Sequence, residues 1–270
     1  MSTPSLFQRR LGTAGPLLAF LPGLALTTRY WEHRVAPLAS AHQLLLLDLL
    51  GFGQSPKPWT RYTVDRHVGA LQDTLGDAGP LTLVGHSVGA MLAMAYAARN
   101  PAQVTGLVLL GLPYFRGDAD ARRFLRSRSR LDRWVLTNMV FASIACVLTR
   151  HVTRRLLPTL LPGLPREVVE DYVLHSWRSA TSTVREVVYG YDLAEDARRL
   201  PHDLPVLLLH GAQDRTAPVE RVRSLVREHP GWRLEELRGA GHNLLLDDAA
   251  WCLARIGDFV DARAPQAKVS

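Results

Sequence analysis

The sequence predicts an α/β domain built on a mostly parallel twisted sheet with helices on both faces. Short aliphatic runs recur along the chain, and spans with helical spacing of apolar residues separate them. Strands that are buried on both faces read as continuous apolar runs, and strand–helix alternation is typical of a parallel sheet. A length of 270 residues fits one such core with an insertion.

The predicted strands, in chain order, are 17–21, 44–48, 81–84, 107–110, 206–210 and 234–237. All except the last are mainly apolar runs. Helical spacing predicts helices over 64–75, 91–99 and 219–229. Because ligands of parallel sheets bind at the carboxyl ends of the strands, the loops that follow these strands are the candidate site.

One serine lies on a sharp turn between a predicted strand and a predicted helix, in the segment Gly85-His86-Ser87-Val88-Gly89. Glycines on either side allow a turn tight enough to push the central side chain clear of the sheet. The same pattern also fits an ordinary strand-to-helix turn. The interpretation of Ser87 as a nucleophile therefore depends on partner residues elsewhere in the chain.

Two later loops supply those partners. Asp214 follows the strand 206–210, and His242 follows the strand 234–237. A serine hydroxyl needs an imidazole to take its proton, and a carboxylate to fix the tautomer of that imidazole. Alone, Asp214 also fits a turn or a helix cap, and His242 fits a solvated loop residue. The order Ser87, Asp214, His242, each after a strand, favours a catalytic triad.

With these residues in place, the sequence resembles the α/β-hydrolase fold superfamily, in its serine-nucleophile branch of esterases, lipases and thioesterases. The resemblance is carried by 85–89 as the nucleophile elbow, 48–55 as an early turn, 211–218 as the acid loop and Gly241-His242 as the base loop. It implies an α/β-hydrolase core over 1–111 and 201–270, a helical cap inserted late in the sheet over 112–200, and no cofactor. A serine at position 87 excludes the branches with an aspartate nucleophile.

The chain departs from the family at the loop after the first predicted strand. The family usually has His-Gly there, whereas this chain has Pro22-Gly23. The resemblance implies that the backbone N–H groups of Leu24 and Val88 form the oxyanion hole. Because these donors are backbone groups, a proline at position 22 does not remove them.

The predicted cap is strongly basic. Residues 116–155 contain ten arginines and three aspartates, in a chain of formal net charge +7. Inside it, 134–148 is apolar but too short to span a bilayer. Three interpretations are open: a helix that roofs the pocket, an interfacial helix in weak contact with a membrane surface, and a basic rim for anionic thioesters. Nucleic acid is not expected, because stacking aromatics do not alternate with the arginines.

Two cysteines in apolar surroundings, Cys146 and Cys252, indicate buried thiols, and the protein is expected to be cytoplasmic. No His or Cys spacing indicates a metal. Asp118 is a weaker candidate for the triad acid. The predicted function is cleavage of a small ester or thioester with an apolar acyl or aryl part. Carbon–carbon bond hydrolysis, acyl transfer and non-catalytic ligand binding on the same fold are alternatives, and the oligomeric state is open.

Overall fold

The computed structural model describes residues 5–127 and 165–262, and in this part of the chain a seven-stranded sheet has the order β1-β3-β2-β4-β5-β6-β7. Neighbouring strands are parallel, except that β1 is antiparallel to β3. The strands are β1 (Gln8–Leu11), β2 (Leu17–Leu21), β3 (Gln43–Leu47), β4 (Leu81–His86), β5 (Val104–Leu110), β6 (Val206–Gly211) and β7 (Arg233–Leu237). The predicted α/β class with a mostly parallel sheet is therefore confirmed.

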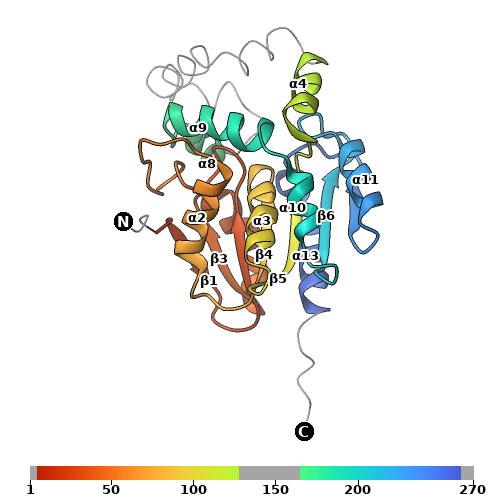
Figure 1. Ribbon diagram of the computed structural model, residues 1–270. Helices are drawn as coiled ribbons and strands as arrows, with labels where there is room; N and C mark the ends of the chain where they lie inside the picture. Colours follow the sequence, from red (N-terminus) through yellow and green to blue (C-terminus); the bar gives the residue numbers. More distant parts are fainter. Residues whose placement is uncertain (1–4, 128–164, 263–270) are drawn as a thin grey trace.

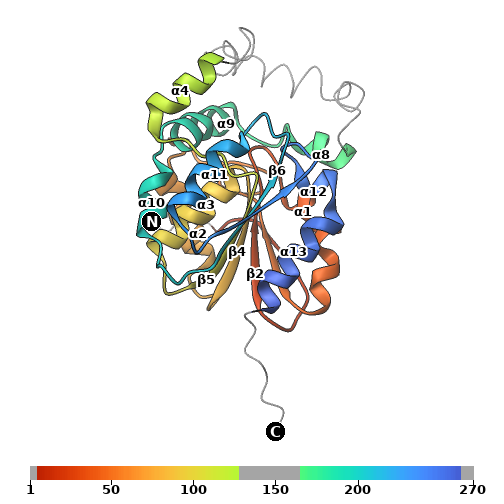
Figure 2. The ribbon, with the colours of Figure 1, turned by 90° about the vertical axis from the view of Figure 1, so that its right-hand side faces the viewer.

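Helices cover both faces of the sheet (Figures 1 and 2). The helical segments are α1 (Thr28–Val35), η1 (Ala36–Ser40), α2 (Val64–Leu75), α3 (Val88–Arg99), α4 (Gly117–Ser127), α8 (Arg166–Asp171), α9 (Trp177–Thr183), the π-helical η3 (Val184–Tyr189), α10 (Leu193–Arg199), α11 (Val219–Glu228), α12 (Leu244–Asp247) and α13 (Ala249–Asp261). Helices α2, α3, α10 and α11 contribute to one hydrophobic cluster, while α1, α12 and α13 contribute to the other.

The two clusters explain why the central strands are mainly apolar. In β2, Leu18 and Phe20 belong to the cluster with α1 and α13, while Ala19 and Leu21 belong to the cluster with α2 and α3. All four side chains have no exposed surface. Successive strand residues point to opposite faces, so a sheet covered on both sides needs apolar residues throughout. This apolar pattern is the one from which all the predicted strands except 234–237 were recognised.

Strand β1 was not predicted. Its sequence is Gln-Arg-Arg-Leu, and its first three residues are exposed. It lies at the edge of the sheet, antiparallel to β3. An edge strand is not covered on both faces, and charged side chains there hinder pairing with another chain. The apolar signal that revealed the other strands is therefore absent from it.

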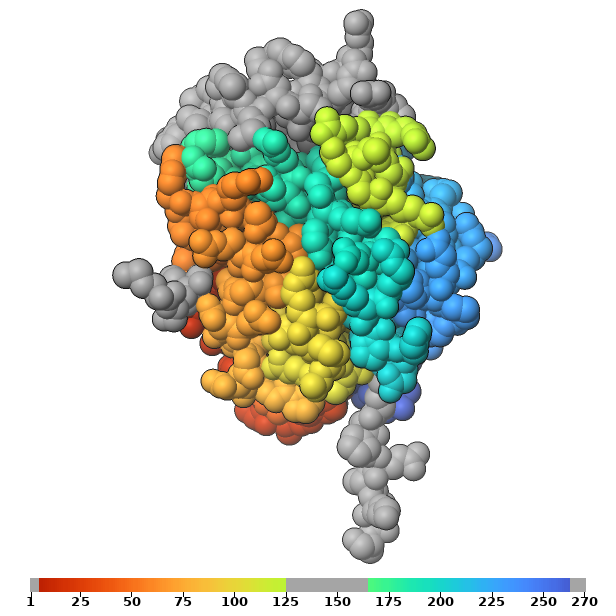
Figure 3. Space-filling view, viewed as in Figure 1, coloured from red at the N-terminus to blue at the C-terminus, as the bar shows by residue number. Residues whose placement is uncertain are grey.

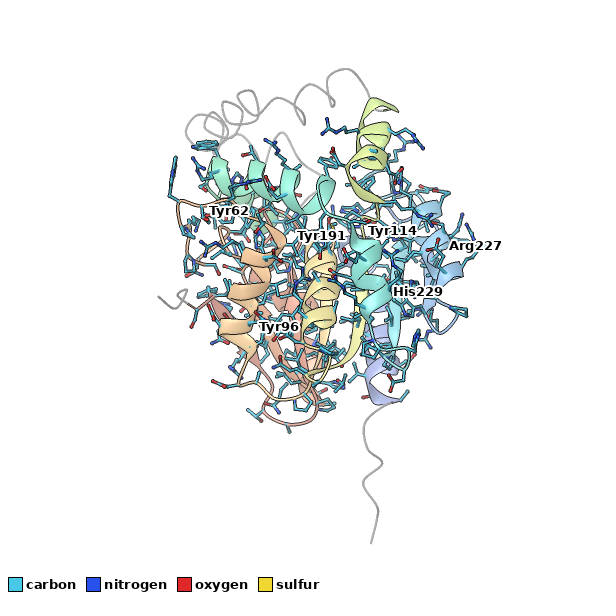
Figure 4. All side chains as sticks on the ribbon, viewed as in Figure 1. Tyr62, Tyr96, Tyr114, Tyr191, Arg227 and His229 are labelled. Carbon is cyan, nitrogen blue, oxygen red and sulfur yellow. The ribbon has the colours of Figure 1, made fainter. Side chains whose placement is uncertain are left out.

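The described residues between β5 and β6 form α4, α8, α9, η3 and α10. Helices α4, α8 and α9 lie beyond the carboxyl ends of the strands (Figures 1 and 2). Helix α10 instead lies beside α3 (Figure 3). Arg99 of α3 donates to Asp196 of α10 at 3.3 Å and to the hydroxyl of Tyr191 at 3.0 Å. Tyr191 is labelled in Figure 4 and lies just before α10 in the chain. The division into core and cap at 112–200 stays a prediction.

The apolar segment 134–148 and Cys146 lie outside the described residues. Cys252 is a buried free thiol in α13. Among the residues that the structure describes, helices that are both long and apolar enough to cross a bilayer are absent.

Candidate active site

Ser87 lies on the sharp turn between β4 and α3, as predicted. Its backbone has φ 54° and ψ −118°, a conformation that is strained for a residue with a Cβ and costs roughly 1–3 kcal/mol. A Cβ at position 89 would lie 2.2 Å from the carbonyl oxygen of Leu21, and one at position 85 would lie 2.5 Å from that of Gly89. Both positions therefore require glycine, and the surrounding packing holds the strained turn.

Three side chains form a hydrogen-bonded chain across the ends of three strands. His242 Nε2 lies 2.9 Å from Ser87 Oγ, and His242 Nδ1 lies 2.7 Å from Asp214 Oδ2. A carboxylate oxygen only accepts, so Nδ1 donates to Asp214. In the neutral imidazole, Nε2 is then the acceptor for the hydroxyl proton of Ser87. The structure thus brings together the three residues that the sequence predicts as a triad.

The carboxylate of Asp214 is almost fully buried and well supplied with donors. Its Oδ1 accepts the backbone N–H groups of Thr216 and Ala217, each at 2.8 Å. Burial raises the pKa of Asp214, but hydrogen bonds from His210 and His242 outweigh it and hold that pKa well below the ordinary value. Asp214 is therefore ionised wherever His242 needs a fixed tautomer.

His86, the residue before Ser87, packs between Tyr30 and His242. Its ring stacks on Tyr30, with centroids 5.1 Å apart, and lies 5.1 Å from the His242 ring. Its Nε2 lies 3.0 Å from the backbone oxygen of His242. Burial, with a smaller contribution from the charge of His242, lowers the pKa of His86 to about 3. His86 is therefore neutral at physiological pH.

Ser87 and His242 line a cavity of about 360 Å³. Its wall is mainly apolar and includes Leu24, Val88, Phe115, Phe124, Val188 and Tyr189. The Phe115 ring contacts those of Phe124 and Tyr189, with centroids 5.3 and 6.0 Å apart. Arg, Lys, Asp and Glu side chains are absent from the described lining. Such a cavity fits a small apolar group beside a few polar atoms.

The two residues predicted for the oxyanion hole both line this cavity. Val88 is the first residue of α3, where a backbone N–H has no acceptor within the helix. Leu24 lies in the turn that follows Pro22-Gly23, which is closed by a hydrogen bond of 3.1 Å from Leu26 N to Gly23 O. Their role as oxyanion donors stays a prediction.

Other acidic residues lie apart from the hydrogen-bonded chain. Asp118, the weaker candidate for the triad acid, lies on α4 and is half exposed, and Arg122 Nε donates to it at 2.7 Å. Asp48, at the end of β3, is buried and accepts the backbone N–H groups of Thr28 and Gln54, each at 2.7 Å. In the described ranges, clusters of His, Cys, Asp or Glu that could hold a metal ion are not found.

Sequence reasoning missed His210, which lies in β6, four residues before Asp214. Its side chain is fully buried, and its Nε2 lies 3.4 Å from Asp214 Oδ2. The available signal was a histidine at the end of a strand, immediately before the glycine that opens the acid loop.

The fold and this site define an α/β protein with a sharp strand–turn–helix segment at the centre of its sheet. The family model described as alpha/beta hydrolase fold matches residues 16–249. The chain therefore belongs to the alpha/beta hydrolase fold family.

Individual relatives are distant. The chain is 26% identical over 260 residues to "Probable lysophospholipase BODYGUARD 3" of Arabidopsis thaliana, covering 85% of this chain and 52% of the relative, so it spans about half the length of that relative. Among solved structures, bromoperoxidase from Bacillus anthracis has a TM-score of 0.74 at 19% identity, covering 95% of each chain. A thermophilic esterase from Thermogutta terrifontis has a TM-score of 0.73 at 19% identity, covering 98% of each chain. At this identity the two structures show the fold alone.

Proposed function

We propose that the protein is a serine hydrolase that cleaves an ester or thioester with an apolar acyl or aryl part. The observation that carries the proposal is the hydrogen-bonded chain from Ser87 through His242 to Asp214, with Ser87 Oγ facing an apolar cavity. Membership of the alpha/beta hydrolase fold family, and the likeness to a probable lysophospholipase, are consistent with it.

The reaction has two halves. Ser87 Oγ attacks the carbonyl carbon while its proton passes to His242 Nε2, and collapse of the tetrahedral intermediate returns that proton to the leaving alcohol or thiol. Water then attacks the acyl-enzyme, giving a proton to His242, and the second collapse returns it to Ser87 as the acid departs. Asp214 holds Nδ1–H of His242 throughout and stabilises the imidazolium.

Negative charge develops on the carbonyl oxygen in both halves. We assign its stabilisation to the backbone N–H groups of Leu24 and Val88, which belong to residues of the cavity wall. The N-terminus of α3 adds a positive dipole end at Val88. Losing one such donor typically lowers the rate on the order of 100-fold or more.

The cavity wall restricts the acyl or aryl part. Phe115, Phe124 and Val188 offer apolar surface, and the described lining has no Arg or Lys side chain to pair with an anionic substrate group. This favours an uncharged apolar acyl or aryl group over an anionic one.

The test is intact mass after exposure to a fluorophosphonate probe. The wild-type protein is expected to gain one adduct, Ser87→Ala is expected to gain none, and Ser40→Ala, which removes an exposed serine on η1, is the matched control and keeps the adduct. Turnover of p-nitrophenyl esters of graded chain length then defines the acyl range. An unlabelled wild-type protein, or a Ser87→Ala variant that is still labelled, contradicts the proposal.

A further inference from the structure

Two buried histidines at strand ends have no role as acid or base in the proposed reaction. His86 is the last residue of β4, and His210 is the next-to-last residue of β6. Their exposed fractions are 1% and 0%. Of the three histidines His86, His210 and His242, His242 is the one whose ring lies at hydrogen-bonding distance from Ser87 Oγ. The presence of the other two therefore needs another explanation.

The partner atoms fix the tautomer of both rings. His210 Nε2 lies 2.6 Å from the backbone oxygen of Ala217, and His86 Nε2 lies 3.0 Å from that of His242. A carbonyl oxygen only accepts, so each Nε2 carries the proton and donates. Each histidine therefore ties the end of a core strand to one of the two loops that carry Asp214 and His242.

The other ring nitrogen, Nδ1, indicates that the Nε2 hydrogen bonds are the reason for a histidine at these two positions. In the part of the chain that the structure describes, Nδ1 of both His86 and His210 is buried without a hydrogen-bond partner. Burying an unpaired polar atom is unfavourable, and an apolar side chain of similar size would avoid it. Packing alone therefore does not explain a histidine at either position, whereas the Nε2–H donor does.

The acid loop is closed around the Asp214 carboxylate. Ala217 N–H donates to Asp214 Oδ1 at 2.8 Å, while the Ala217 carbonyl accepts from His210. The same Nε2 of His210 lies 3.4 Å from Asp214 Oδ2, the oxygen that His242 also contacts. Holding Ala217 from both its N–H and its carbonyl fixes the direction of the carboxylate.

The base loop is tied directly to the acid loop. Gln213 N donates to Ala240 O at 2.9 Å, and a Cβ at position 211 would lie 2.0 Å from Gly241 O, so the two backbones touch there. His86 reaches the same base loop from β4 through the carbonyl of His242. Movement of either loop would therefore change the distance between His242 and its partners.

We propose that His210 and His86 are positioning residues, which clamp the acid loop and the base loop so that Asp214, His242 and Ser87 keep hydrogen-bonding distance. The proposal rests on the proposed function of those three residues. The low pKa of His86, about 3, keeps its ring neutral and its tautomer constant over the working range of a histidine base.

The first test uses His210, which does not line the cavity. His210→Leu is expected to lower kcat on a soluble p-nitrophenyl ester on the order of 10- to 100-fold with KM unchanged, because a small displacement of the carboxylate misaligns His242. His210→Gln, which keeps an N–H donor at similar reach, is expected to recover most of kcat. A Gln variant as impaired as the Leu variant overturns the proposal.

The matched control is His42→Leu. His42 is also buried, donates to Leu38 O at 3.2 Å and contacts Asp261, but it precedes β3 at the amino end of the sheet. Loss of this histidine is expected to leave kcat unchanged. If it lowers kcat as much as His210→Leu does, the effect belongs to general loss of packing and the clamp is rejected.

The second readout does not depend on activity. Hydrogen exchange of the Thr216 and Ala217 amides is expected to quicken in His210→Leu and to stay slow in His210→Gln, and residues 240–243 are expected to respond to His86→Leu in the same way. Unchanged exchange overturns the clamp. If the wild-type protein reacts with neither ester nor probe, the proposed function fails, while exchange still decides whether these histidines hold the loops.

Discussion

Asp48 and Asp214 occupy similar places in the fold and differ in one respect. Each follows a buried strand at the carboxyl end of the sheet, with exposed fractions of 1% and 6%, and each accepts two backbone N–H groups. Burial raises the pKa of Asp48 above its ordinary value, whereas the pKa of Asp214 lies well below it. Burial and backbone hydrogen bonds therefore do not distinguish the two carboxylates.

Their remaining neighbours make the difference. Burial is the main cause of the raised pKa of Asp48, and the nearby carboxylate of Asp171 raises this pKa further. The hydrogen bonds from the Gln54 and Thr28 backbone N–H groups lower it, but only in part. Asp214 has two imidazole donors in place of a second acid. Asp48 is thus suited to holding the turn that follows β3, and Asp214 is suited to its proposed role of stabilising a positive charge on His242.

The largest expected effect is a loss of esterase activity when the Asp214 carboxylate is removed. Asp214→Asn is expected to lower kcat on the order of 10³- to 10⁴-fold, because the amide no longer selects the tautomer in which His242 Nε2 accepts from Ser87. Steady-state turnover of a soluble ester measures this. Asp118→Asn, at the half-exposed acid paired with Arg122, is the control and should keep full activity. Equal kcat of wild type, Asp214→Asn and Asp118→Asn would contradict the proposed role of Asp214 in orienting His242.

Asp48→Asn is expected to act on stability instead. An amide can accept from only one of Thr28 N and Gln54 N, so one buried N–H loses its acceptor, at about 1–3 kcal/mol. Tm should fall by roughly 2 to 10 °C. Differential scanning calorimetry beside kcat checks this. A variant with wild-type Tm but greatly reduced kcat would place Asp48, not only Asp214, in the chemistry.

The smallest expected effect is a pair of opposite pH slopes in the free energy of unfolding. The folded pKa of Asp214 lies below its unfolded value of about 3.9, so its stabilisation is present above that pH and is lost as the pH falls. The folded pKa of Asp48 lies above about 3.9, so ionisation of Asp48 opposes folding as the pH rises through that pKa.

Urea unfolding between about pH 3 and 7 tests both slopes. On acidification, the stability advantage of wild type over Asp214→Asn should shrink, while wild type should gain stability relative to Asp48→Asn. Slopes of the same sign for the two comparisons would show that the two carboxylates do not differ as described.

The fold could be predicted because its strands carry a strong signal. Leu18 and Phe20 face one helix layer and Ala19 and Leu21 face the other, so the run from which β2 was predicted has no polar position. Strand β1 could not be predicted, because Gln8, Arg9 and Arg10 lie exposed at the sheet edge.

The site could be predicted in part. Ser87, Asp214 and His242 each follow a strand, and the carboxyl ends of parallel strands meet, so their proximity follows from the order of elements. Their distances and catalytic roles do not follow in that way, and those roles stay proposals. The contacts of His210 with Ala217 and of His86 with the His242 carbonyl depend on how two loops fold back on strand ends, which residue spacing does not encode.

Direct contact between the acid and base loops affects how the protein can be re-engineered. Because Gln213 bonds to Ala240, and Gly211 lies against Gly241 with no room for a side chain, neither loop has a conformation independent of the other. A loop grafted from another protein would have to bring its counterpart with it. The two loops would therefore have to be transplanted together as one unit.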